Sequence, residues 1–326
     1  MRIRLMMPIA AAIALSSSVI AAQEPSATEL MAKVGAYAAA YGEKASFVVA
    51  TETYTQSLAI EGQAQMPRPI KLVAEFAIVK LQGGGWTGFR DVISVNDEAV
   101  RDRKDRLMSL LTSESASLSE ATRIANESSR YNVGAISRNI NTPTAALFFF
   151  LPPNLDRFTF TKKGAKTIDG VKTIEIVYKE TKLPTLITTR SGKNVPLEGS
   201  LFVMDDGTVV RTRMQMEKFA DSQTGVEQQA PRTTGPTNVT GNGGGRPAQS
   251  GQVTAMDTRP IDSSADIEVT YKKPDGIDLW LPSHMDELYE GPITAMRIRT
   301  TTGRSTTRAT YANFKQFGSS GKIISQ

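Results

Sequence analysis

The chain has 326 residues, with 38 lysines and arginines against 33 aspartates and glutamates, and a formal net charge of +5. Basic and acidic residues are interleaved, as in RDRKDR at 101–106, so no basic stripe of the kind that nucleic acid requires is present and we expect no nucleic-acid binding. The absence of cysteine and the presence of one histidine exclude disulfides and the usual zinc ligand sets, so we expect no metal and no cofactor.

The first 22 residues have the pattern of an export signal. Arg2 and Arg4 precede an apolar stretch that ends in small residues, and this stretch is shorter than the roughly 20 apolar residues of a comfortable membrane span. We therefore expect residues 1–22 to be a cleaved signal peptide. Without Arg2 and Arg4 of this signal peptide, 36 basic residues remain against 33 acidic ones, so the mature chain has a net charge of +3. We expect the mature protein to be periplasmic or secreted and not to span a membrane.

An amphipathic helix is predicted at the start of the mature chain. Ser26 and Glu29 have the spacing of a capping box, in which each side chain satisfies an amide at the helix start. The apolar residues that follow recur on one helical face: Leu30, Val34, Tyr37 and Tyr41. The pattern predicts a helix over about 26–42.

The pattern then changes to the alternation of β-strands. Three stretches rich in β-branched and aromatic residues, 46–60, 71–81 and 85–95, predict three strands. The glycines at 83–85 predict a turn between the second and the third, and Asn96-Asp97 predicts another turn after the third.

A helical block follows, with a second capping box at Ser117 and Glu120, and it leads into TPTAALFFFLPPN at 142–154. Pro143 and the double proline that begins at Pro152 bound about two helical turns without a charged residue. This segment is too short to span a membrane. Because it is apolar on every side, it must be enclosed by the fold.

Alternating strands return after residue 155. The clearest hairpin covers 200–218 and turns on Asp206-Gly207, and further strands are predicted at 266–273, 294–300 and 307–317. Successive one-sided strands joined by tight turns predict an antiparallel sheet with one face on the core. The regular alternation of helices and strands that is typical of a parallel sheet is not found in the sequence. We therefore predict the fold class α+β.

One segment interrupts this pattern. Residues 221–258 are rich in Gly, Thr, Gln, Asn and Pro and have too few apolar side chains to offset the entropy of ordering, so we expect a disordered insertion loop. The strands on both sides belong to one sheet by pattern. Residues 23–326 are therefore predicted to form a single domain.

Residues capable of catalysis are few. His284 lies near Asp286 and Glu287, but no Gly-x-Ser-x-Gly motif offers a nucleophile, and we expect the histidine to lie in a turn after Pro282. Two carboxylates could hydrolyse a glycoside, and the candidates for such a pair are Asp91, Asp102, Asp205, Asp206 and Glu290. Any chain this rich in acidic residues offers as many, so we predict that the protein is not an enzyme.

Aromatic side chains gather on or beside the predicted strands and the apolar segment. They are Trp86, Phe89, Phe148, Phe149, Phe150, Phe158, Phe160, Trp280, Tyr289, Tyr311 and Phe314. Most buried aromatic residues only pack in a core. Alternatively, helices over a concave sheet face leave a pocket for an acyl chain or another apolar ligand.

The order of elements resembles that of the outer-membrane lipoprotein-sorting family, the LolA/LolB-like half-barrels. The likeness is carried by the closing part of the chain, LWLPSHMDELYEG at 279–291 followed by strands that end in ATYANFKQF at 309–317, although no ligand-gating residue of the family matches a position here. It implies a curved antiparallel sheet, a half-barrel, with helices over its concave face.

The resemblance also implies a periplasmic, non-enzymatic carrier for a lipid or a lipoprotein acyl chain. The residues expected to line the ligand site are Leu147, Phe148, Phe149, Phe150, Leu151, Trp86 and Trp280. The alternative is a cell-envelope interaction module with a solid core and no ligand pocket, in which the loop 221–258 meets a partner protein.

Overall fold

The computed structural model describes residues 25–316 except 47, 81–85, 101–122, 124, 125, 127, 135, 139, 190, 220–224, 229–261 and 296–298. The predicted signal peptide, the glycine turn at 83–85, the capping box at 117–120 and most of the loop 221–258 lie outside the described residues. None of the described helices is long and apolar enough to cross a membrane.

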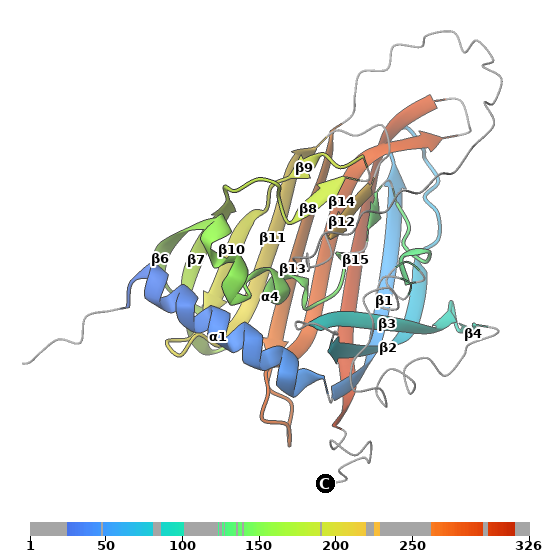
Figure 1. Cartoon of the computed structure of the whole chain (residues 1–326). Helices are drawn as coiled ribbons and strands as arrows, with labels where there is room; N and C mark the ends of the chain where they lie inside the picture. The colour runs from blue at the N-terminus through green and yellow to red at the C-terminus, as the bar shows by residue number, and fades with distance from the viewer. Residues whose placement is uncertain are drawn as a thin grey trace, which may run out of the picture.

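Eleven antiparallel strands form one large curved sheet (Figure 1). In chain order they are β1 (Val48–Ile60), β2 (Ile70–Lys80), β3 (Trp86–Val95), β4 (Glu98–Ala99), β6 (Phe158–Ile168), β7 (Val171–Glu180), β10 (Glu198–Val203), β11 (Val209–Phe219), β13 (Ser263–Lys272), β14 (Leu281–Ala295) and β15 (Arg299–Gln316). Across the sheet the order is β4-β3-β2-β1-β15-β14-β13-β11-β10-β7-β6. Among the described residues β4 and β6 are the two edges, so the sheet is open.

Short helices lie across the concave face of this sheet (Figure 1). They are α1 (Ala27–Ala45), α4 (Ala145–Phe149) and the 3-10 helix η1 (Pro152–Arg157). A second small sheet has the order β5 (Ser137–Arg138), β12 (Gly225–Gln228), β8 (Ile187–Thr189) and β9 (Asn194–Val195). The predicted fold, an α+β half-barrel with helices over its concave face, is confirmed.

The N-terminal helix begins as predicted. The amide of Glu29 donates to the Ser26 hydroxyl over 3.2 Å, and the Glu29 carboxylate accepts from the Ser26 amide over 2.8 Å, which completes the capping box. The helix ends at Ala45, three residues beyond the predicted 42. Its buried face packs on the sheet through residues such as Leu30 and Val34.

Two predicted turns also form. Asn96 and Asp97 both have positive φ, 50° and 67°, which is the geometry of a tight hairpin turn between β3 and β4. Gly207 has a φ of 88°, and a Cβ at this position would lie 2.6 Å from the backbone carbonyl carbon of Lys33. The turn at Asp206-Gly207 therefore needs glycine both for its backbone and for the close approach of α1.

The apolar segment forms less helix than predicted. The α-helix α4 has five residues in place of about two turns, and it ends at Phe149. Leu151 is extended, with a ψ of 146°, because a residue before proline is disfavoured in the helical region. The chain then continues as the 3-10 helix η1, whose first two residues are the double proline.

The strand β14 corrects one prediction. His284 does not lie in a turn: it lies inside β14, paired with Thr270 of β13 and Thr310 of β15. The turn prediction depended on Pro282, but that proline only opens the strand, where its missing N–H is tolerated. Of the range 221–258 the structure describes only residues 225–228, which form strand β12 and pair with β5 and β8.

Candidate ligand-binding face

The concave face has an apolar region, which we call the aromatic cluster: Trp86, Phe148, Phe149, Phe150, Phe158, Phe160 and Tyr178. Phe150 lies at its centre, with ring centroids 4.8 Å from Tyr178 and 5.3 Å from Phe158. Phe148 contacts the edge of Trp86 at 6.0 Å. These edge-to-face and tilted contacts are the arrangements that aromatic pairs prefer.

The residues expected to line a ligand site are mostly brought together here. Leu147, Phe149 and Phe150 are at most 1% exposed, and Trp86 packs beside them and donates its ring N–H to the Ala38 carbonyl over 3.3 Å. Leu151 is only partly buried.

Trp280 lies apart from this group. It precedes β14 and packs, partly buried, against the edge of the core. Among the described residues, no ring contact joins Trp280 to the phenylalanines of α4.

Beside the aromatic cluster lies a buried polar cluster, which we define as Glu52, Tyr54, Arg90, Arg138, Asn141, Glu287, Tyr289, Ser305, Thr307 and Tyr311. It comes from the inward faces of β1, β3, β14 and β15 and from the segment that precedes α4. Nine of these ten polar side chains are less than 5% exposed, and Tyr311 is 6% exposed. Such a group is unusual, because protein interiors are mostly apolar.

The first half of the polar cluster is a complete ion pair. Arg90 binds the Glu52 carboxylate with both Nε and Nη2, the latter over 2.8 Å to Oε1, and Tyr311 donates to the same carboxylate over 2.7 Å. Arg90 Nη2 also donates to the Asn141 carbonyl over 3.0 Å. A buried charge is stable only when it is paired and hydrogen-bonded in this way.

The second half is incomplete. Arg138 Nη1 donates to the carbonyls of Val133 and Ile136 over 3.0 and 3.1 Å, while Nη2 lies 3.7 Å from Glu287 Oε2 without forming a hydrogen bond. Tyr54 donates to Glu287 Oε2 over 2.8 Å.

Burial controls ionisation in this half of the cluster. Removal from water raises the pKa of Glu287 above its usual range, although Arg138 acts in the opposite direction. Burial next to Glu287 raises the pKa of Tyr54 to about 12. The Tyr289 hydroxyl is close enough to Glu287 to affect its pKa, but it forms no hydrogen bond of regular geometry.

The sequence interpretation missed the polar cluster. A signal was present, because Glu52 occurs at an inward position of the β1 alternation, between Ala50 and Tyr54. Glu287 similarly occupies an inward position of β14, between Met285 and Tyr289. A charge at a core position of a strand indicates a buried partner. The partners Arg90 and Arg138 lie on other elements, so their pairing is visible only in the fold.

The residues considered for catalysis are dispersed. His284 lies on the face away from the helices, and its Nε2 is 2.7 Å from the partly exposed Asp286. Asp205 and Asp206 lie in their exposed turn, Glu290 pairs with Arg304, Asp91 is buried on β3, and Asp102 lies outside the described residues. Within the described ranges, no group of three or more His, Asp or Glu side chains is placed to hold a metal ion.

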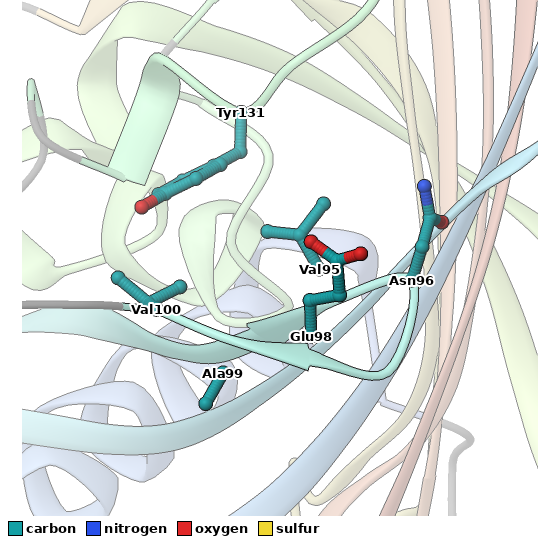
Figure 2. A pocket seen from close by; sticks show the side chains of 6 residues that line it. All are labelled: Val95, Asn96, Glu98, Ala99, Val100 and Tyr131. Atoms are coloured by element: carbon teal, nitrogen blue, oxygen red, sulfur yellow. The ribbon is translucent and has the colours of Figure 1, made fainter.

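A hollow of about 380 Å³ lies at the β4 edge of the sheet (Figure 2). It is lined by Val95, Asn96, Glu98, Ala99, Val100 and Tyr131. Figure 2 shows the Tyr131 ring across from Val95 and Val100, and the Glu98 carboxylate beside Val95. None of its lining residues belongs to the aromatic cluster.

Comparison with solved structures finds several matches at low sequence identity. A domain assigned to outer-membrane lipoprotein sorting from Vibrio parahaemolyticus matches with 8% identity and a TM-score of 0.34, over 87% of this chain and 91% of that one. A DUF1329 family protein from Desulfovibrio piger matches with 11% identity and a TM-score of 0.28, over 87% and 92%. A LolA superfamily protein from Nitrosomonas europaea matches with 7% identity and a TM-score of 0.27, over 90% and 94%.

The matched structures include a lipoprotein-sorting domain and a LolA superfamily protein, which belong to the group that the sequence resembles. No family model matches the sequence, and no curated protein matches it either. At TM-scores this low the likeness says nothing about what the chain binds, so the case for a function rests on its own side chains.

Proposed function

We propose that the protein is a non-enzymatic binding protein of the bacterial cell envelope, and that it carries a lipid or a lipoprotein acyl chain on the aromatic half of its concave face. The observation that supports this most directly is α4 itself, a five-residue helix without a charged residue whose phenylalanines cover an aromatic surface of the sheet. An acyl chain offers the same apolar contact as these side chains and can take their place.

The construction of α4 supports its displacement. Its N-cap residue, Thr144, makes no side-chain capping bond, and the Thr144 hydroxyl is buried without a hydrogen bond. A helix this short has little stability of its own, because nucleation is unfavourable and most helical stability comes from packing. What holds α4 is apolar burial, of about 1.5–3 kcal/mol for each large side chain, which a ligand can replace.

Two further features support a carrier over an enzyme. His284 lies on the opposite face from the aromatic cluster, beside a carboxylate and among threonines of neighbouring strands. The carboxylates considered for a hydrolytic pair are spread over separate turns and strands.

The test is to extract the purified full chain with organic solvent and analyse the extract by mass spectrometry. We expect an acyl lipid in near-stoichiometric amount. Titration of delipidated protein with the methyl ester of hexadecanoic acid would then change Trp86 fluorescence, because displacement of Phe148 removes a ring from the Trp86 edge. Replacing Trp280 by phenylalanine leaves Trp86 as the sole tryptophan reporter. An extract without lipid and a titration without response would contradict the proposal.

A second candidate is an envelope interaction module with a solid core. It is favoured by the burial of Phe149 and Phe150, each 1% exposed, which leaves the aromatic cluster packed without a ligand. In that case partner capture depends on the loop 221–258. Deletion of residues 229–258, which keeps strand β12, would abolish capture and leave thermal stability unchanged, whereas a carrier would keep its lipid content and would have no partner to lose.

A further inference from the structure

The two buried arginines of the concave face differ in one respect. An arginine presents Nε and Nη2 as a planar fork that matches two oxygens of a carboxylate. Arg90 fills this fork with Glu52. Arg138, at 1% exposure, forms no hydrogen bond through its Nε or its Nη2, although Nη2 lies 3.7 Å from Glu287 Oε2.

Four other unpartnered polar atoms lie near this fork. They belong to the Glu287 carboxylate, through Oε1, and to the hydroxyls of Tyr289, Ser305 and Thr307. Glu287 lies directly opposite Thr307 in the β14–β15 pairing, and Tyr289 lies directly opposite Ser305. Cross-strand partners on one face are about 4.5–5.5 Å apart at Cβ, so these side chains form one patch. The guanidinium of Arg138 lies over it, 3.9 Å from the centre of the Tyr289 ring.

The patch is covered by residues 132–134 and 136–138. A Cβ at Gly134 would lie 2.5 Å from Ser305 Oγ, so the backbone of the segment lies directly on the sheet there, in a conformation with a φ of 117° that favours glycine. Asn132 Nδ2 holds the segment by donating to the Arg138 carbonyl over 2.8 Å. Buried polar atoms without partners are rare in folded proteins and each calls for an explanation.

We propose that the Arg138 fork and the hydroxyls of Tyr289, Ser305 and Thr307 bind the carboxylate head of an anionic amphiphile such as a long-chain fatty acid. This rests on the proposed function and names its ligand class. The fork takes both carboxylate oxygens, and the hydroxyls donate to them. To admit the head group, residues 132–134 and 136–138 move away from the sheet together with α4.

The charges of the cluster favour a head group with a single negative charge. Glu52 and Arg90 neutralise each other, and so do Glu287 and Arg138 when Glu287 is ionised. When Glu287 is protonated, the site has one positive charge, and Glu287 Oε1 becomes able to donate to the ligand. A doubly charged phosphate beside Glu287 is repelled more strongly than a carboxylate.

The position of the patch fits an amphiphile. The polar cluster is linked to α4 through Asn141, which accepts from Arg90 and donates to the Tyr54 hydroxyl over 3.0 Å, and the chain reaches α4 four residues later. A head group on Arg138 therefore has the aromatic cluster beside it for its acyl chain.

The test uses the full chain and two probes, hexadecanoic acid and its methyl ester. We expect the acid to bind at least about tenfold more tightly than the ester, because a hydrogen bond to a charged group contributes about that factor in affinity. Tyr289→Phe and Thr307→Val are expected to weaken the acid about tenfold each and to leave the ester unchanged. The matched control is Tyr37→Phe, which removes another buried, unpartnered hydroxyl away from the patch and is expected to change neither affinity.

The stability of the unliganded variants separates a ligand role from a structural one. Because the Tyr289 hydroxyl forms no hydrogen bond of regular geometry, Tyr289→Phe is expected to leave the melting temperature unchanged or to raise it. Tyr271→Phe, which loses a 2.6 Å bond to the Pro143 carbonyl, is expected to lower it. A loss in Tyr289→Phe as large as in Tyr271→Phe, with unchanged affinity for the acid, would overturn the proposal.

The outcomes also separate this inference from the function on which it rests. If acid and ester bind equally and Tyr289→Phe changes neither, the head-group site is wrong while the acyl carrier stands. If neither probe binds, the carrier itself is wrong. Tighter binding of hexadecyl phosphate than of the acid would overturn the choice of a carboxylate.

Discussion

The two halves of the concave face are held together by opposite means. In the aromatic half, α4 is held by non-directional apolar contacts, which any apolar group of similar size can make. In the polar half, the segment before α4 is fixed by hydrogen bonds and ion pairs that only matched partners can make. The difference indicates that an apolar chain is enough to displace the cover in the aromatic half, whereas the polar half opens only to a ligand that supplies matched polar groups.

The largest effect is expected where the polar half loses one member of its complete ion pair. Glu52→Ala leaves Arg90 buried and unpaired and removes the acceptor of Tyr311, so we expect a loss of about 3–5 kcal/mol in the free energy of unfolding. Denaturant titration measures it. Lys80→Ala, which removes the exposed pair with Glu43, is the control and is expected to cost at most about 1 kcal/mol. Equal effects would show that burial of the pair has no consequence.

A slightly smaller loss is expected in the aromatic half. Leu147 is fully buried, so Leu147→Ala removes apolar contact from α4 and is expected to cost about 2–5 kcal/mol. Leu151→Ala is the matched control, because Leu151 is only partly buried beside the same helix. A difference of less than about 1 kcal/mol between the two variants, measured in the same titration, would show that α4 is not held by burial.

Packing of α1 against Trp86 gives a third comparison. A Cβ at Gly42 would lie 1.7 Å from Trp86 Cδ1, so Gly42→Ala forces the indole to move and is expected to cost about 1–3 kcal/mol despite the higher helix propensity of alanine. Gly35→Ala, in the same helix, meets only the end of the Leu155 side chain at 2.9 Å and is expected to be close to neutral. Thermal unfolding of the two variants checks the order, and a more stable Gly42→Ala would contradict it.

The smallest effect is a dependence on pH. Glu287 faces Arg138, Arg90, Tyr54 and Tyr289, and burial raises its pKa in the folded state above the unfolded value near 4.3. The stability that it contributes is therefore fully present below the unfolded pKa and is lost as the pH rises through the folded pKa.

Glutamine has no such titration, so the melting temperature of Glu287→Gln relative to the original chain is expected to rise between about pH 4 and pH 7. The control is Glu290→Gln, because the Glu290 carboxylate pairs with Arg304 on the surface. A difference between Glu287→Gln and the original chain that is flat or falls with pH would contradict the raised pKa.

Local pattern predicted much of this fold. The capping box of Ser26, the turn at Asn96 and the alternation of strands such as β11 follow from interactions between residues near each other in the chain. The helix-breaking prolines also placed α4 correctly, because their effect is local.

Long-range pairing could not be predicted in the same way. β1 pairs with β15, more than 200 residues away, and this contact joins the N-terminal hairpins to the C-terminal strands in one sheet. The same pairing brings Glu52 to Tyr311, and it places Glu287 beside Tyr54. The polar cluster depends on how these strands are aligned with one another, and the residue pattern within a single strand does not predict that alignment.

The replaceable α4 can be tested by locking it to the sheet. A Cβ at Gly88 of β3 would lie 2.9 Å from Thr144 Oγ1, so cysteines at these two positions are close enough for a disulfide in a chain that has no other cysteine. The control pair is Gly291→Cys with Ser263→Cys, where a Cβ at Gly291 would lie 3.4 Å from Ser263 Cβ and the bond joins β14 to β13 without touching α4.

The deciding measurement is the affinity for the methyl ester of hexadecanoic acid, taken for each double variant in its oxidised and reduced forms. If α4 must leave the sheet, the oxidised Gly88→Cys, Thr144→Cys protein will not bind, reduction will restore binding, and the control pair will bind in both forms. Undiminished binding by the oxidised Gly88→Cys, Thr144→Cys protein would contradict the account.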